Sequence, residues 1–298
     1  MIAVGLCGWG DHPRIYKEAA AKNKLSAYAE WFSVVEVDSS FYAVQAPALM
    51  QKWADDTPAE FRFVVKAYQG MTGHSRGGGY KPFPDEAAMV QAFLESIAPL
   101  RAAGKLLAVL FQYPPWFNCT RPNVELLQAA KAAMGEVPCA LEFRHQSWFV
   151  PGMREKTLDF IRREGWIHTV CDEPQAGEGS VPIVEAACDE RVTLVRLHGR
   201  NTDGWRSAGQ PNWRDVRYLY RYNELELKDW ADRLRRLERL SETVCTLFNN
   251  NSGGDAADNA LHLMAMLGQT PPRGSFGSKS GSEEPAQQLD LFDLPDTW

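Results

Sequence analysis

Ionisable residues spaced two positions apart stand at the ends of three apolar runs of this chain. They are Glu36 with Asp38, Glu142 with Arg144, and Arg196 with His198. If the runs are β-strands, both members of a pair point to the same face, because side chains alternate with a period of two. Carboxylate and imidazole groups exchange protons with substrates, and guanidinium groups bind phosphates or carboxylates. The spacing therefore predicts acid–base chemistry on an anionic substrate.

Single polar residues end the remaining apolar runs and extend this predicted pocket. The predicted acid–base groups are Glu36, Glu142, His145, Asp172 and His198. The predicted anion-binding groups are Lys66, Gln112, Arg144, Arg196 and Asn249. Among the first group, we expect Glu142 or Asp172 to act as the base, with assistance from His198. Among the second, Lys66, Arg144 and Arg196 are expected to hold a phosphate.

The same residues allow two other interpretations. A purely structural network, such as an ion pair of Glu142 with Arg144, would also gather charges at the strand ends, because buried charges need partners. A single divalent metal held by Glu142, Asp172 and His198 is the second alternative. Three nearby cations oppose it, and the chain has no metal-binding motif such as H-E-x-x-H. No cofactor is assigned, and the metal stays an open alternative.

Strand-like and helix-like segments alternate along the chain and would position these residues. The strand-like runs are 3–9, 34–42, 61–68, 106–114, 139–148, 166–174, 191–199 and 243–250. The helical patterns are 24–32, 47–55, 85–103, 123–134, 154–164, 225–240 and 256–267, with Asn123 and Asp255 as expected N-caps and a weak signal around Pro182–Cys188. Alternation of this kind predicts an α/β fold, a single (β/α)8 barrel of the TIM type. In such a barrel the carboxyl ends of all strands meet at one face and form the active site.

Composition limits the class of protein. The 298 residues carry a net charge of −6, so the chain as a whole lacks the basic character of most nucleic-acid-binding domains. The six cysteines are scattered without a C-x-x-C pair, which disfavours a disulfide framework or a thiolate zinc site. No run approaches the ~18 apolar residues of a membrane span, and the first residues lack the basic start of a signal peptide. We expect a cytoplasmic protein that makes no membrane contact.

Several sequence blocks resemble the YecE-like domain of unknown function. They are GWGDHP, VEVDSSFYAVQ, FRFVVKA, FQYPPWF, LEFRHQSW, VRLHGR and FNNNSGGDAADNA, spread from about Gly5 to Leu267. The resemblance implies a β/α barrel and no assigned activity. By position, the polar signature of the family falls on Glu36, Lys66, Gln112, Glu142, Arg144, His145, Ser147, Trp148, Asp172, Arg196, His198, Asn249 and Asn250. It thereby adds Asn250 to the anion-binding set.

A composition change near Gly268 predicts a boundary between the barrel, residues 1–268, and a disordered tail, residues 269–298. The tail is rich in Gly, Pro, Ser and charge, which cannot build a core. It contains QLDLF, formed by Gln288, Leu289, Asp290, Leu291 and Phe292. This resembles the pentapeptide with which bacterial replication and repair proteins bind the sliding clamp, the β subunit of DNA polymerase III. Docking of the tail onto its own barrel is the alternative.

Together these features predict an enzyme of DNA repair or replication, a hydrolase or lyase acting on a phosphate-containing substrate. The tail would bring it to the sliding clamp, and contact with DNA would follow. A metabolic enzyme for a small phosphorylated or carboxylated substrate is the first alternative. A non-catalytic adaptor associated with the clamp is the second.

Overall fold

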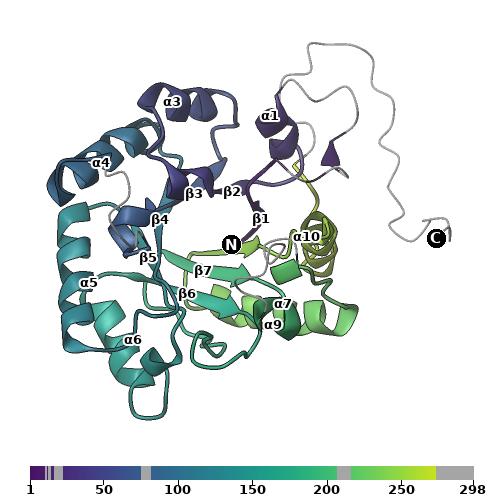
Figure 1. Cartoon of the computed structure of the whole chain (residues 1–298). Coiled ribbons are helices and arrows are strands. Elements are labelled where there is room, and N and C mark those ends of the chain that lie inside the picture. The colour runs from purple at the N-terminus through teal and green to yellow at the C-terminus, as the bar shows by residue number, and fades with distance from the viewer. Residues whose placement is uncertain (11, 13–14, 17–22, 75–81, 207–215, 273–298) are drawn as a thin grey trace, which may run out of the picture.

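The computed structural model describes residues 1–10, 12, 15–16, 23–74, 82–206 and 216–272. Eight parallel strands follow one another in sequence order around a closed barrel, with β1 pairing with β8 (Figure 1). The strands are β1 (Ile2–Cys7), β2 (Val34–Val37), β3 (Arg62–Lys66), β4 (Leu106–Gln112), β5 (Cys139–Glu142), β6 (Ile167–Asp172), β7 (Val192–Leu197) and β8 (Thr243–Phe248). The predicted (β/α)8 architecture is confirmed.

Helices pack around the barrel and follow its strands. They are α1 (Lys24–Ala29), α2 (Ser39–Tyr42), α3 (Pro47–Asp55), α4 (Glu86–Ala102), α5 (Arg121–Met134), α6 (Arg154–Arg163), α7 (Thr202–Arg206), α9 (Glu224–Glu238) and α10 (Asp255–Met266), with 3₁₀ turns η3 (Gln69–Thr72) and η4 (Gln146–Trp148). Helix α9 illustrates their construction. Asn223 and Glu226 form a capping box at its start, and Leu227, Trp230 and Leu234 bury one face against the barrel.

Two apolar layers hold the barrel together. The larger layer lies between strands and helices. The smaller one fills the barrel interior with Val34, Val64, Ala108, Leu110, Ala140, Ile167, Val192, Leu194, Cys245 and Leu247. Because these interior residues recur with a period of two, they define which later residues of each strand also point inward.

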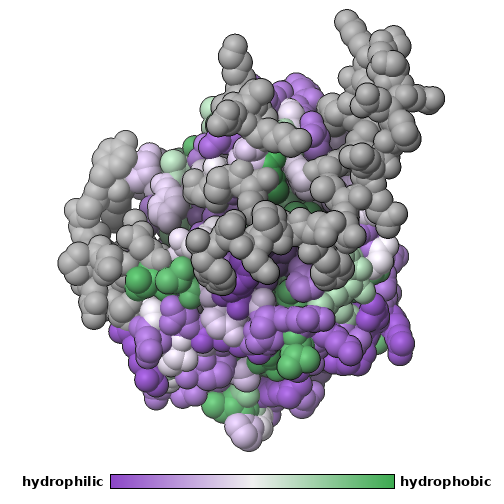
Figure 2. Space-filling model, turned by 90° about the vertical axis from the view of Figure 1, so that its right-hand side faces the viewer, coloured by the Kyte–Doolittle hydropathy of each residue, from purple (hydrophilic) through white to green (hydrophobic). Residues whose placement is uncertain are grey.

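The carboxyl end of the barrel is polar. The arrowheads of β6 and β7 in Figure 1 point toward the side of the molecule that Figure 2 presents to the viewer. On this face, hydrophilic residues predominate among the described ones, and apolar residues form small separate patches. Over the described ranges, no helix is both long enough and apolar enough to cross a membrane.

Three local predictions were wrong. The run 34–42 is not one strand, because the backbone turns at Asp38 and residues Ser39–Tyr42 form a short helix. Helix α5 begins after Thr120 instead of Asn123, and α10 begins at Asp255 itself, after Gly254 with a left-handed φ of 80°. An aspartate in the first turn still interacts favourably with the helix dipole.

The connection between β6 and β7 contains no helix around Pro182–Cys188. Side chains hold this segment instead of a helical hydrogen-bond ladder. The carboxylate of Glu173 accepts a hydrogen bond from the backbone N–H of Val181 at 2.6 Å, and the His168 ring contacts the Val184 carbonyl at 3.0 Å. An irregular segment therefore covers the barrel where a helix was expected.

Candidate active site

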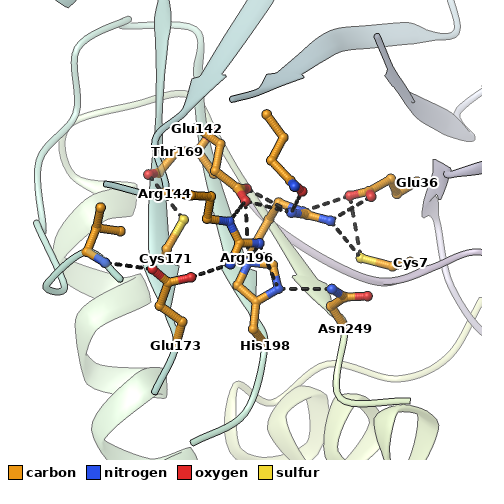
Figure 3. A network of polar contacts seen from close by, with 12 residues as sticks. Cys7, Glu36, Glu142, Arg144, Thr169, Cys171, Glu173, Arg196, His198 and Asn249 are labelled. Carbon is orange, nitrogen blue, oxygen red and sulfur yellow. Dashed lines mark hydrogen bonds and ion pairs between the residues drawn. The ribbon is translucent and has the colours of Figure 1, made fainter. Parts of the chain in front are cut away.

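A buried network of charged side chains fills the carboxyl end of the barrel interior (Figure 3). Most of its members lie two or four residues after an interior apolar residue of the same strand, and so point to the same face. Val34 leads to Glu36, Ala140 to Glu142 and then Arg144, and Leu194 to Arg196 and then His198. The network therefore continues the barrel core toward the carboxyl ends of the strands. The three predicted pairs supply five of its residues.

Arg196 lies at the centre of the network and joins opposite sides of the barrel. Its Nε and Nη2 donate to the two carboxylate oxygens of Glu36 at 2.9 and 2.7 Å. Its Nη1 donates to both oxygens of Glu142 at 3.0 and 2.8 Å and to Gln112 Oε1 at 3.2 Å. One bidentate contact with Glu36 and one bifurcated contact with Glu142 fix this buried guanidinium tightly.

Arg144 forms the second centre. Its Nε donates to Glu142 Oε1 at 2.6 Å, its Nη1 contacts the Glu173 carboxylate, and its Nη2 lies 3.0 Å from His198 Nε2. The indole of Trp205, on α7, lies 5.4 Å from the Arg144 guanidinium and 3.8 Å from that of Arg217. The Trp205 ring thus covers this part of the network.

The contacts of His198 define its protonation state. Burial lowers the pKa of His198 well below its usual value, and the Arg144 charge lowers it further, so the ring is neutral. Nitrogen donors face both ring nitrogens of His198: Arg144 Nη2 lies 3.0 Å from Nε2, and the Asn249 amide nitrogen Nδ2 lies 2.9 Å from Nδ1. His198 accordingly orients Arg144.

Two glutamates of the network have pKa values displaced in opposite directions. Burial alone would raise the pKa of Glu142, but Arg144 and Arg196 hold it well below the usual range. Burial raises the pKa of Glu173 to about 7, because its guanidinium partner Arg144 does not compensate for the loss of water. Near neutral pH, Glu142 is ionised while Glu173 exchanges a proton.

Lys66 and Asp38 form an ion pair closer to the solvent. The Lys66 amine lies 3.0 Å from Asp38 Oδ1, and the two side chains are 12% and 42% exposed. Burial would raise the pKa of Asp38, but Lys66 lowers it, so the carboxylate is ionised. The Lys66 side chain is therefore more exposed than those of Arg144 and Arg196, at 4% and 1%, and its partner is a carboxylate.

Asp172 does not join the network. It points outward from β6, where Arg200 Nε lies 3.0 Å from both of its carboxylate oxygens and Trp230 Nε1 donates to Oδ2 at 2.8 Å. The inward residues of this strand are Ile167, Thr169, Cys171 and, beyond its end, Glu173. The predicted register of β6 was wrong by one residue, which moves every side chain to the opposite face.

His145 and Asn250 also lie outside the network. His145 caps the turn η4, with Nδ1 2.8 Å from Ser147 Oγ. The Asn250 amide donates to the Tyr220 carbonyl and to Asn259 Oδ1, both at 2.8 Å, beneath helix α10. These contacts involve no member of the buried network, so both residues have structural roles.

The metal alternative fits the side chains poorly. Ligand atoms of Glu142, Cys171 and His198 lie within 4.8 Å of one another, with Cys171 in the place predicted for Asp172. However, both carboxylate oxygens of Glu142 already bind guanidinium groups. Burial also raises the pKa of the Cys171 thiol well above its usual value, whereas a metal ligand must be a thiolate. The guanidinium groups of Arg144 and Arg196 thus already neutralise the carboxylate that a metal ion would need.

Sequence reasoning missed Glu173, Cys7 and Cys171. The Cys7 thiol lies 3.4 Å from Glu36 Oε2, and it continues the inward face of β1. Glu173 follows Asp172 directly, and a period-two count from Ile167 would have selected it. A cavity of about 370 Å³ adjoins Glu173 at the edge between β6 and β7, lined also by Gln175, Ile183 and Arg200.

Comparison with known proteins agrees with this architecture. Residues 3–285 match the family described as "Protein of unknown function DUF72". The chain belongs to the DUF72 family. It is 54% identical over 269 residues to UPF0759 protein YunF of Bacillus subtilis, covering 90% of this chain and 95% of that one. It is 28% identical over 189 residues to UPF0759 protein YecE of Escherichia coli K12, covering 63% and 65%.

Solved structures of DUF72 members share the fold. A DUF72 family protein from Enterococcus faecalis superposes with a TM-score of 0.84 at 33% identity, over 97% of this chain and all of that one. The resemblance to the YecE-like domain is therefore confirmed. QLDLF lies outside both the described residues and the family match, which ends at residue 285.

Proposed function

We propose that this DUF72 protein is a hydrolase or lyase that acts on a phosphate-containing substrate by general acid–base catalysis at the carboxyl end of the barrel. One observation carries the proposal. Glu142 and Glu173 share Arg144, yet their pKa values are displaced in opposite directions, and that of Glu173 is about 7. Two carboxyl groups separated in this way are typical of an acid–base pair in an active site.

Each residue then has a definite role. Glu173 donates or accepts a proton near neutral pH, and ionised Glu142 stabilises positive charge that develops beside it. Lys66, which is more exposed than Arg144 and Arg196, binds the phosphate of the substrate. Arg196 holds Glu36 and Glu142 in place, and His198 with Asn249 orients Arg144. Asp172 has no part in this mechanism.

The test is turnover by the full chain of a panel of phosphorylated metabolites and damaged DNA, followed by mass spectrometry. Glu173→Gln should lose at least ~100-fold in kcat, since general acid–base groups contribute about 10²–10⁴-fold. Glu178→Gln, an exposed carboxylate in the same connection, is the matched control and should retain activity. Equal turnover by wild type and Glu173→Gln, or no turnover across the panel, would reject the proposal.

We also propose that QLDLF at 288–292 recruits the protein to the sliding clamp and so to DNA repair or replication. The supporting observation is its position three residues beyond the end of the family match, as an addition to the barrel. An extended peptide places Leu291 and Phe292 in an apolar pocket of a partner, with Gln288 at its edge.

Surface plasmon resonance of the full chain on immobilised clamp tests this. Saturable binding that is lost in Leu291→Ala/Phe292→Ala supports recruitment, with an expected affinity in the micromolar range, about 8 kcal/mol. No binding up to ~100 μM, about 5.5 kcal/mol, excludes it and leaves a metabolic enzyme for a small anionic substrate. Clamp binding together with an inactive barrel would instead favour an adaptor.

A further inference from the structure

Aromatic side chains from three successive connections meet beside the mouth of the barrel. Phe41 and Tyr42 end α2 after β2, His74 follows η3 after β3, and Trp116 lies in the connection after β4. We call these four residues the aromatic rim. Their ring centroids form a chain of edge-to-face contacts, with 5.2 Å between Phe41 and Tyr42, 4.9 Å between Phe41 and His74, and 6.0 Å between His74 and Trp116.

The rim exposes large aromatic surfaces. Tyr42 is 58% and Trp116 45% exposed, and among the described residues they are the aromatic members of the exposed large hydrophobic set. The other exposed members are aliphatic and lie elsewhere, such as Leu126 on α5. Aromatic rings that converge from separate connections at the active end of a barrel form a surface suited to stacking with a ligand ring.

Charged groups adjoin the rim on the side of the buried network. The Lys66 amine lies 4.6 Å from the centroid of Phe41 and 3.0 Å from Asp38 Oδ1. The His74 ring is neutral, because burial and then the charge of Lys66 lower its pKa to about 4. The rim itself is therefore uncharged, while one of its rings directly contacts the Lys66 cation, whose side chain is 12% exposed.

We propose that the aromatic rim binds the base of a nucleotide, while the phosphate of the same ligand binds at Lys66. A planar base stacks on exposed Trp and Tyr faces regardless of its identity. Phe41 belongs to the rim and contacts the Lys66 amine. The rim and the amine together therefore suit a ligand that carries both a planar ring and an anion. This inference rests on the proposed function only in giving the ligand a phosphate.

Isothermal titration calorimetry of the full chain with AMP, GMP, CMP and UMP tests the proposal, with ribose 5-phosphate and adenosine as matched ligands that lack the base or the phosphate. Nucleoside monophosphates should bind more tightly than ribose 5-phosphate. Trp116→Ala and Tyr42→Ala should each weaken nucleotide binding roughly 5- to 100-fold and leave ribose 5-phosphate binding unchanged. Trp116→Phe should restore most of the affinity, and Leu126→Ala should have no effect.

The outcomes separate the two proposals. Nucleotide affinity that is unchanged in Trp116→Ala and Tyr42→Ala overturns the rim, even when ribose 5-phosphate binds and the phosphate site stands. If adenosine binds as tightly as AMP, base binding by the rim is supported and phosphate binding at Lys66 is rejected. A short single-stranded oligonucleotide as a further arm shows whether the base belongs to a free nucleotide or to a nucleic acid. Absence of binding by every nucleotide, nucleoside and oligonucleotide overturns the proposal.

Discussion

Replacement of Glu173 by glutamine should change how the stability of the protein depends on pH. The folded chain raises the pKa of this carboxyl from 4.5 to about 7, chiefly through burial. A carboxyl that binds its proton more tightly when folded stabilises the protein most below its unfolded pKa. That stabilisation is lost as the pH rises through the folded value. The wild-type contribution of Glu173 should therefore fall by about 2–3 kcal/mol between pH 5 and pH 8.

Glutamine at this position keeps the hydrogen bond from the Val181 N–H and cannot ionise. The free energy of unfolding of Glu173→Gln minus that of the wild type should consequently rise by about 2–3 kcal/mol from pH 5 to pH 8. Taking the difference cancels the titration of all other groups. Urea unfolding at several pH values measures it, with Glu178→Gln as the control whose difference should stay constant. A constant difference for Glu173→Gln as well would refute the reasoning about the buried carboxyl.

Three further predictions concern the supports of the site. Arg196→Leu leaves Glu36 and Glu142 without their shared cation and should cost about 3–5 kcal/mol in urea unfolding, whereas a loss below ~1 kcal/mol would show that the network is not tightly coupled. Trp230→Phe removes the hydrogen bond to Asp172 and should lower the free energy of unfolding by about 1–2 kcal/mol while leaving activity intact. A large loss of kcat in this variant would return Asp172 to the active site. On α9, Leu234→Ala should lower the free energy of unfolding by about 2–5 kcal/mol. Leu225 is 79% exposed, so Leu225→Ala should lower it by less than about 0.5 kcal/mol. Equal losses in the two leucine variants would contradict the assigned helix face.

The sequence predicted the pairs whose strands have a clear inward register. In β5 and β7 the ionisable pair follows interior apolar residues without interruption, so Glu142 with Arg144 and Arg196 with His198 were placed correctly. The barrel class followed from the number and alternation of the runs. Both predictions depend on the spacing of apolar residues within each run and on the order of the runs along the chain. A single sequence contains both kinds of information.

Register failed in β6, where two acids stand side by side at the end of the strand. Every residue of β6 is buried, as in β5 and β7, so burial alone does not separate Asp172 from Glu173. The two acids are adjacent and chemically similar, and only three-dimensional packing assigns one to Trp230 and the other to Arg144. Asn249 and Asn250 present the same ambiguity after β8. The pKa of Glu173 likewise depends on burial and on a partner distant in sequence.

The helix-free connection between β6 and β7 has a consequence for amide hydrogen exchange. Its backbone forms few hydrogen bonds with itself, and side chains such as Glu173 and His168 hold it against the barrel. Amides of residues 175–188 should therefore exchange through local opening at a free energy well below that of the strands. Since the Val181 N–H binds Glu173, each such opening releases that carboxyl to water. The proton of Glu173 can thus equilibrate with solvent without unfolding of the barrel.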